Sequence, residues 1–400
     1  MSQVKRRLAL GFVFAFVVGT ASGTAQLSQN AGRVDDHLTV HEWGTFTSVA
    51  GRDGRAAEWR PLDGPSDLPS FVYTREELEI GAGLRHGSHS LKASLETLVR
   101  METPVIYFYT DRETDVSVRV DFPQGIITEW YPRLRSIWDK QIDWGRLKIL
   151  PGTRPIFPGG WKDSHYYKAR ATDSAPVRVC GKSGAQSEKF LFYRGVASFP
   201  VPLSVRLEGD RIFLKNNGQR KIARLIVFEN RGGKVGFRMQ DGLEREATLE
   251  RPAMDGTLDQ ICEELKKILT AEGLYEKEAQ AMIATWRDSW FEEGLRVFYT
   301  FPRESTDEVL PLHIEPAPSK LVRVMVGRAE IITPEMESEI EQAVTGLRSS
   351  NAEVRNRATK CLQKHGRFAA TALKRILDRT KDRGSRALIS QLLAAQSSVQ

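Results

Sequence analysis

The sequence predicts an α+β fold: an antiparallel β-sandwich-like body with an embedded helical hairpin, followed by a small all-α C-terminal region. Short segments rich in β-branched and aromatic residues, separated by Gly, Pro and Asn turns, recur through residues 38–301. Two amphipathic segments within residues 257–293 and apolar residues at helical spacing after residue 333 indicate helices.

The first strands of the body are expected between residues 39 and 131. Residues 39–49 alternate loosely, and residues 105–109 form an apolar run suited to a strand buried on both faces. Residues 116–122 alternate strictly, which places their apolar side chains on one face. After a turn at 123–125 the pattern returns at 126–131, and this tight spacing predicts a meander.

A second set of strands follows a stretch rich in Pro, Gly and Ser at residues 149–184, which is interpreted as long loops. These strands are expected at 189–193, 203–207, 211–215, 222–228 and 235–239. Their lengths and spacing favour an antiparallel sandwich over βαβ units.

The helical hairpin begins at Thr257, which has the capping-box spacing to Gln260, and its first helix ends at Gly273. The second helix, at about 275–293, carries Trp286 and Trp290 on one stripe. We expect this stripe to pack against strands that follow, at 295–301, 310–314 and 321–326.

The C-terminal region reads as helical throughout. Thr333-Pro334 predicts an N-cap with proline in the first turn, and Ser350 to Glu353 predicts a second capping box. The chain is therefore divided into 1–25 (signal peptide), 26–150 (first β meander of the body), 151–252 (loop-rich joint and second set of strands), 253–332 (helical hairpin plus closing strands) and 333–400 (basic helical region).

Residues 1–25 have the pattern of a secretory signal peptide. Lys5-Arg6-Arg7 precede an uncharged apolar stretch at 8–18, and small residues lead to a Gly23-x-Ala25 cleavage site. The apolar stretch is shorter than the ~20 residues that span a bilayer. We therefore expect a periplasmic or secreted protein that is soluble after cleavage and has no transmembrane anchor.

No metal or cofactor is predicted. His41-Glu42 lacks the second histidine of a zinc-peptidase helix because residue 45 is Thr. If this stretch is a strand, His37 and His41 lie about 13 Å apart and share no metal. Cys180, Cys262 and Cys361 are too widely spaced for a Cys-x-x-Cys site; they are interpreted as free thiols, buried at Cys262 and Cys361, or as one disulfide plus a free thiol.

A Glu-Trp dipeptide occurs three times in the first third of the mature chain: Glu42-Trp43, Glu58-Trp59 and Glu129-Trp130. One interpretation is a ligand surface in which the rings of Trp43, Trp59 and Trp130 stack on a sugar or peptide. The alternative is strand alternation, with Trp inward and Glu outward. Glu42, Glu58 and Glu129 are also weak candidates for the paired carboxylates of a glycan hydrolase.

The basic charge is concentrated in the tail. The chain carries a net charge of +7, and residues 351–400 contain eleven Lys and Arg against three acidic residues. The residues proposed for a partner surface are Arg355, Arg357, Lys360, Lys364, Lys374 and Arg375. Without interleaved aromatic residues or zinc spacing, nucleic acid is not expected. An acidic protein surface, anionic lipid headgroups or plain solvation remain open, and a tail cation could also pair with Glu292 or Glu293.

Two resemblances bear on function. Ala352-Glu353-Val354-Arg355-Asn356-Arg357-Ala358, with Leu362, Gly366 and Leu373, resembles a HEAT-type helical repeat, which implies a protein-interaction surface. The motifs HEWGTFTS, METPVIYFYT and ITEWYP, with TWRDSWFEEG and VRVMVGRAEIITPE, are similar to an uncharacterised family of exported bacterial proteins. We expect an exported binding or scaffold protein for an envelope-associated protein or glycan, and alternatively an extracytoplasmic hydrolase of glycan or peptide bonds.

Overall fold

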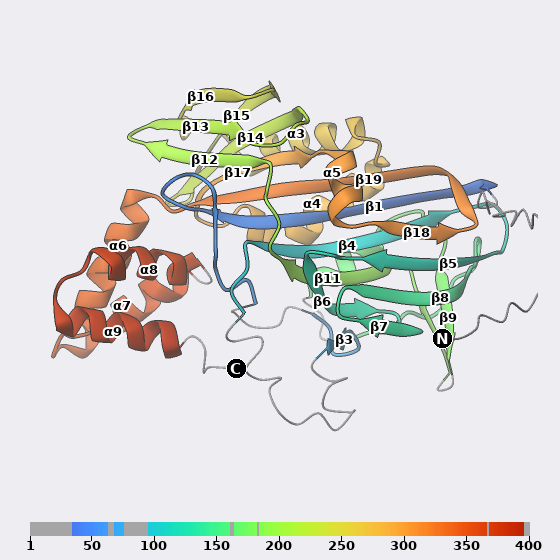
Figure 1. Ribbon diagram of the computed structural model, residues 1–400, viewed down its shortest axis with the longest axis horizontal. Helices are drawn as coiled ribbons and strands as arrows, with labels where there is room; N and C mark the ends of the chain where they lie inside the picture. The colour runs from blue at the N-terminus through green and yellow to red at the C-terminus, as the bar shows by residue number, and fades with distance from the viewer. Residues whose placement is uncertain are drawn as a thin grey trace, which may run out of the picture.

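The computed structural model describes residues 34–62, 68–75, 95–160, 164–181, 184–365 and 368–395. Within them the predicted fold class is confirmed: large, mainly antiparallel sheets carry a helical hairpin, and a helical region follows at the C-terminus (Figure 1). The predicted signal peptide at residues 1–25 lies outside the described residues.

The strands are β1 (Val34–Ala50), β2 (Ala56–Ala57), β3 (Tyr73–Thr74), β4 (Val99–Tyr109), β5 (Thr114–Asp121), β6 (Gly125–Tyr131), β7 (Ser136–Trp138), β8 (Gln141–Ile149), β9 (Val177–Gly181), β10 (Gly184–Glu188), β11 (Leu191–Ala197), β12 (Leu203–Glu208), β13 (Arg211–Asn216), β14 (Ile222–Arg231), β15 (Lys234–Leu243), β16 (Glu246–Glu250), β17 (Gly294–Phe301), β18 (Leu312–Glu315) and β19 (Ala317–Ile331). The helices are η1 (His165–Arg170, a 3-10 helix), α3 (Leu258–Ala271), α4 (Glu276–Trp290), α5 (Arg303–Val309), α6 (Pro334–Gly346), α7 (Ala352–His365), α8 (Ala369–Arg379) and α9 (Arg383–Ala395).

The strands of the described residues form sheets of ten, six and three strands. The largest has the order β15-β14-β17-β19-β1-β4-β11-β6-β3, with β2 paired to β1. Its long central strands β1 and β19 run parallel, whereas the other strand pairs of this sheet are antiparallel within the described residues. The sequence did not predict this parallel pair, because strands far apart in the chain carry no local signal of their pairing.

The predicted meander is wrong. β4 and β6 belong to the ten-stranded sheet, with β11 between them, while β5 pairs with β8 and β18 in the six-stranded sheet. The alternation within β5 is nevertheless confirmed, since Val116, Val118 and Val120 are all buried. They pack in an inter-sheet core, which we define as the buried cluster between the ten-stranded sheet and the two smaller sheets. One smaller sheet has the order β10-β9-β8-β5-β18, with β7 paired to β8, and the other has the order β12-β13-β16.

The helical hairpin covers the opposite face of the ten-stranded sheet (Figure 1). The Thr257/Gln260 capping box is confirmed, and Gly273 takes a φ of +107° just after α3, a conformation that favours glycine. Trp286 and Trp290 pack against β17 and β19, as predicted, but not against the third expected strand, because β18 belongs to the six-stranded sheet on the other side. They contribute to a helix-side core, defined as the cluster that joins α3, α4 and η1 to this face of the sheet.

Helices α6–α9 form an all-helical region at one end of the body (Figure 1). The predicted N-cap of α6 is confirmed, because the Thr333 hydroxyl accepts from the N–H of Met336 and proline occupies the first turn. For α7 the prediction was off by one residue: Asn351 rather than Ser350 accepts the N–H of Glu353. Among the helices of the described residues, none is long and apolar enough to cross a membrane.

Candidate functional site at the helical junction

The three tryptophans of the Glu-Trp dipeptides lie in three different buried clusters. Trp43 is in the helix-side core, Trp130 in the inter-sheet core, and Trp59 in a junction core that joins the helical region to the body. Each is at most 2% exposed. The rings neither converge nor reach solvent, so the predicted tryptophan-lined ligand surface is wrong. Each tryptophan instead packs in a separate core and faces inward, as the alternative proposed.

The three glutamates do not converge either. Glu42 and Glu129 are buried, whereas Glu58 is exposed, so the expectation of outward Glu side chains holds only at Glu58. The Tyr193 hydroxyl donates a hydrogen bond to Glu42, so these two side chains lie on the same face of the sheet. Tyr193 is also the register partner of Trp130, which lies on that face too. Glu129, the residue before Trp130, therefore points to the opposite face. Two strands separate Glu42 from Glu129, which sets them about 14 Å apart laterally. The two carboxylates of a glycosidase lie within roughly 5–9.5 Å, so this pair does not fit that chemistry.

His41, the first residue of the HEWGTFTS motif, is bound to α4. Its Nδ1 lies 2.7 Å from Oε2 of Glu278, and both side chains are fully buried. The hydroxyl of Tyr109 donates to the other oxygen of Glu278 at 2.8 Å. His37, by contrast, is half exposed and pairs with Asp111. The polar start of the motif therefore ties β1 and β4 to the helical hairpin.

Three of the six predicted partner-surface cations hold the helical region in place. Lys374 on α8 pairs with Glu96 at 2.6 Å. Arg375 donates to the backbone carbonyl of Ile332 at 3.3 Å and also to that of Ala50. Lys364 on α7 pairs with Glu293 at 2.8 Å, which confirms the alternative that a tail cation neutralises an acid at the end of α4.

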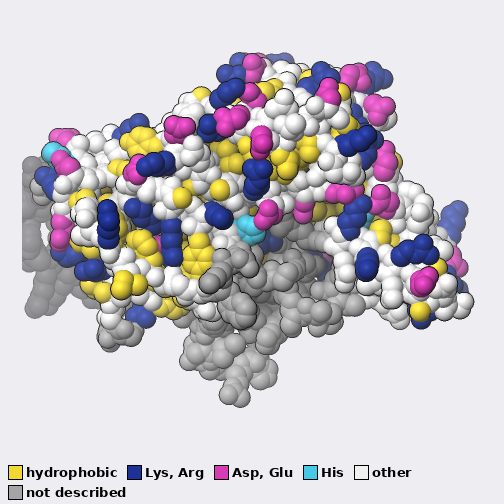
Figure 2. Space-filling view, turned by 180° about the vertical axis from the view of Figure 1, so that it is seen from behind, with side chains coloured by type: hydrophobic (Ala, Val, Ile, Leu, Met, Phe, Trp, Pro, Cys, Tyr) yellow, Lys and Arg dark blue, Asp and Glu magenta, His cyan; other side chains and the backbone are white. Residues whose placement is uncertain are grey.

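The other three cations, Arg355, Arg357 and Lys360, are exposed on α7. Arg355 folds back onto the backbone carbonyls of Ser349 and Ser350, at 2.8 Å each. Arg357 and Lys360 are three residues apart and so share one side of the helix. Figure 2 shows Lys and Arg side chains on the end of the molecule that the helices form, at the right of the view.

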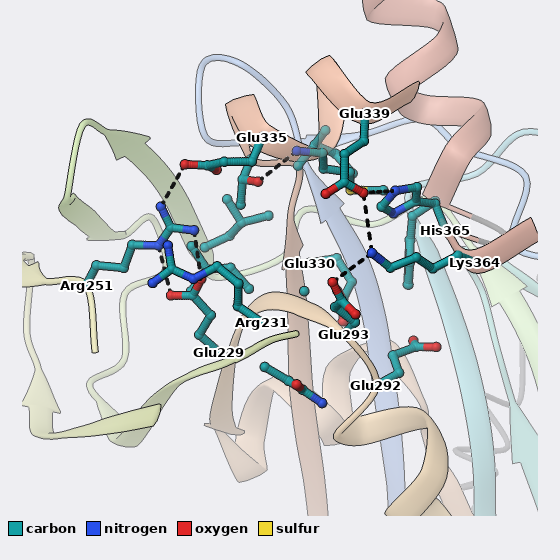
Figure 3. Close-up of a pocket in the computed structure, with 18 residues that line it drawn as sticks. Glu229, Arg231, Arg251, Glu292, Glu293, Glu330, Glu335, Glu339, Lys364 and His365 are labelled. Atoms are coloured by element: carbon teal, nitrogen blue, oxygen red, sulfur yellow. Dashed lines mark hydrogen bonds and ion pairs between the residues drawn. The ribbon is translucent and has the colours of Figure 1, made fainter. Parts of the chain in front are cut away.

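A recess lies where the helical region meets the body, and Figure 3 shows its charged lining. It encloses about 690 Å³, including open solvent at its mouth. On the body side Arg251 donates two hydrogen bonds to Glu229, of 2.7 and 2.8 Å, and one to Glu335 on α6, of 3.2 Å. These carboxylates raise the pKa of Arg251 above its ordinary value, so the bridge stays charged.

Arg328 forms a buried cationic group beside the recess. Its side chain is fully buried and contacts Glu330 and Glu292, the latter at 2.7 Å. Burial lowers the pKa of Arg328, but the two carboxylates more than offset this, and the pKa lies above its ordinary value. Arg296, also fully buried, adds a 3.0 Å pair with Glu330.

On the helical side of the recess, Lys364 lies between Glu293 and Glu339 (Figure 3). His365 also bonds Glu339, with Nε2 3.1 Å from Oε2, and the ring is only 11% exposed. Cys361 lies one turn before His365. Burial raises the pKa of the Cys361 thiol and lowers that of His365.

Donor atoms of Glu339, Cys361 and His365 all lie within 4.8 Å of one another. This cluster was not predicted from the sequence. Cys361 and His365 are four residues apart and therefore share a face of α7, which was the available signal. The third member, Glu339, comes from α6, and no spacing rule connects it to the other two.

Neither the protein-family models nor the curated protein sequences compared with this chain match it. Among solved structures, a yeast delta-COP-I mu-homology domain, in complex with a Dsl1 WxWxV peptide, matches at 9% sequence identity and a TM-score of 0.27. That match covers 75% of this chain and 96% of the other. A similarity this distant carries no argument about function.

Proposed function

We propose that this chain is an exported binding or scaffold protein, and that its helical region presents the surface for an acidic protein partner. The observation that carries the proposal is the division of the tail cations into two groups. One group docks the helices on the body, and the other, with Arg357 and Lys360, remains exposed on α7.

Docking fixes the direction in which α7 faces. Apolar side chains of the body, Val49 and Trp59, pack with Ile340, Phe368 and Leu373 in the junction core. Ion pairs and hydrogen bonds surround this core, as described for Lys364, Lys374 and Arg375. A helical region anchored in both ways presents its outward face in a constant orientation, which suits a scaffold.

An acidic protein fits this face better than a lipid bilayer. Helices that bind membrane surfaces immerse an apolar face between the headgroups. The large exposed hydrophobic residues of the described chain are Val34, Trp138, Ile156, Met239 and Tyr275, and these positions precede α6. Attraction between the α7 cations and carboxylates of a partner requires no apolar insertion and weakens with salt.

The buried carboxylates favour binding over hydrolysis. Glu42 is held by Arg323 and Tyr193, and Glu129 faces the opposite side of the sheet. Glu58 is exposed, but the other two candidate acids are not beside it on one surface. The hydrolase alternative therefore has no pair of converging carboxylates among the residues predicted for it.

The test measures binding of a fluorescent poly-glutamate peptide to the mature chain at low and physiological salt. The double variant R357E/K360E should bind at least tenfold more weakly than the parent. Its matched control is R154E/K168E, which makes the same charge change at exposed positions on the body. Equal loss in both variants would show a net-charge effect and reject the α7 surface. Binding to phosphatidylglycerol vesicles without binding to poly-glutamate would reject an acidic protein partner.

A further inference from the structure

The Glu339, Cys361 and His365 cluster offers the ligand set of a transition-metal ion. It supplies one carboxylate oxygen, one thiol sulfur and one imidazole nitrogen within 4.8 Å of each other. The three donors around a tetrahedral zinc ion are separated by about 3.3–3.6 Å, given the usual zinc–ligand bond lengths. His365 Nε2 and Glu339 Oε2 are already 3.1 Å apart. The Cys361 sulfur lies no more than 4.8 Å from each of them, so a movement of about 1 Å would bring it into that range.

The scaffold around these donors is suited to holding them. Cys361 and His365 sit one turn apart on α7, so the helix itself fixes their separation. Glu339 belongs to α6, which packs on α7. Cys361 and His365 are partly buried, whereas Glu339 is exposed, and Glu339 and His365 line the recess. A metal bound here would cross-link the two helices.

The donor types select the metal. A thiolate and an imidazole prefer Zn²⁺ and similar ions to the hard cations Mg²⁺ and Ca²⁺, which take oxygen ligands. Three protein donors leave one tetrahedral position for water or for a group of another molecule, as in zinc sites that are not purely structural. That position would face the recess, which Glu339 and His365 line.

We propose that Glu339, Cys361 and His365 bind one Zn²⁺ ion at the junction of α6 and α7, with the fourth position open to the recess. On binding, the Cys361 thiol loses its proton to solvent and coordinates as a thiolate, and His365 coordinates as the neutral ring. Glu339 exchanges its hydrogen bonds from Lys364 and His365 for the metal, while Lys364 keeps its pair with Glu293.

The experiment uses the full mature chain carrying C180S and C262S, so that Cys361 is the remaining thiol. Zn²⁺ affinity is measured by competition with a chromophoric chelator, and Co²⁺ is added separately as a spectroscopic probe. We expect one ion per chain and a thiolate-to-cobalt charge-transfer band. C361S should abolish the band, and H365Q and E339Q should each weaken Zn²⁺ binding at least tenfold.

The matched control is E341Q, which removes a carboxylate from the same helix two residues away. Glu341 pairs with Arg379 and lies outside the cluster, so its loss should change Zn²⁺ affinity less than twofold. Circular dichroism in EDTA must show that every variant is folded. The proposal is overturned by less than stoichiometric Zn²⁺ binding in the parent, by a Co²⁺ spectrum without the band, or by unchanged affinity in C361S.

Discussion

Glu42 and Arg323 are register partners on the two parallel strands at the centre of the large sheet, and their side chains form a buried ion pair. Arg323 Nε lies 2.5 Å from Glu42 Oε2, and the side chains are 1% and 0% exposed. Arg323 also donates to Asp307 on α5 at 2.7 Å. Burial lowers the pKa of the Arg323 guanidinium, but these carboxylates more than offset this effect, and the pKa lies above its ordinary value. A charge pair in this position specifies which strands lie side by side.

Replacing Glu42 with Gln should therefore reduce the free energy of unfolding by about 3–5 kcal/mol, because the Arg323 charge stays buried without its main partner. The measurement is urea unfolding followed by tryptophan fluorescence. Glu58→Gln is the control, since Glu58 is exposed and the change should stay within about 0.5 kcal/mol. A fully stable Glu42→Gln variant would contradict the structural role and return Glu42 to the catalytic candidates.

Trp59 should be required for docking of the helical region. Its ring is 1% exposed and stacks on Phe368, with the ring centroids 5.8 Å apart. Trp59→Ala should cost about 3–5 kcal/mol of the interactions at this junction. Hydrogen exchange should then accelerate in α6 and α8 more than in β4, which lies in the central sheet.

Trp138→Ala is the control for this experiment, because Trp138 is 53% exposed and lies outside the junction core. It should leave the exchange of α6 and α8 unchanged. Uniform acceleration across the sheet and the helices in Trp59→Ala would show that the helical region does not open separately from the body.

The fold class was predictable because its signals are local. Strict alternation identified β5, and cap residues placed the starts of α3 and α6 close to their observed positions. Strand order was not predictable, because it depends on contacts between distant segments. The β1–β19 pair joins residues about 280 positions apart, such as Glu42 and Arg323, and β11 lies between β4 and β6 although it follows both in the chain.

The candidate site was less predictable than the fold. Residue type suggested Trp43 and Glu42 as ligand contacts, but a large sheet covered on both faces can bury either face of a strand. Cys361 was interpreted as a buried hydrophobic residue, because no sequence pattern near it indicates that Glu339 on α6 is its neighbour. Sites assembled from two packed helices become visible only when the packing is known.

Acid should weaken the contact between α8 and the body. A hydrogen bond from Lys374 holds the pKa of Glu96 below its ordinary value of 4.5. A carboxylate with a lowered folded-state pKa stabilises the fold above its ordinary pKa, and this contribution is lost as the pH falls through the lowered value. Lys374→Met should raise the Glu96 pKa, as measured by ¹³C NMR of the side-chain carboxyl. Lys360→Met, at an exposed position on α7, should not; an unchanged Glu96 pKa in Lys374→Met would contradict the assignment.

Lys364 should oppose metal binding at the neighbouring cluster. Its ammonium lies 3.3 Å from the Glu339 oxygen that also bonds His365, so a bound cation would experience its positive charge. Removing one unit charge at about 4 Å is worth at least ~1 kcal/mol in water, so Lys364→Gln should tighten Zn²⁺ binding about fivefold or more. Lys374→Gln changes the same charge on α8, where the lysine pairs with Glu96, and should have a smaller effect. Weaker Zn²⁺ binding in Lys364→Gln would instead mean that the Lys364–Glu293 pair is needed to position α7, because the loss of that pair would then outweigh the relief of repulsion.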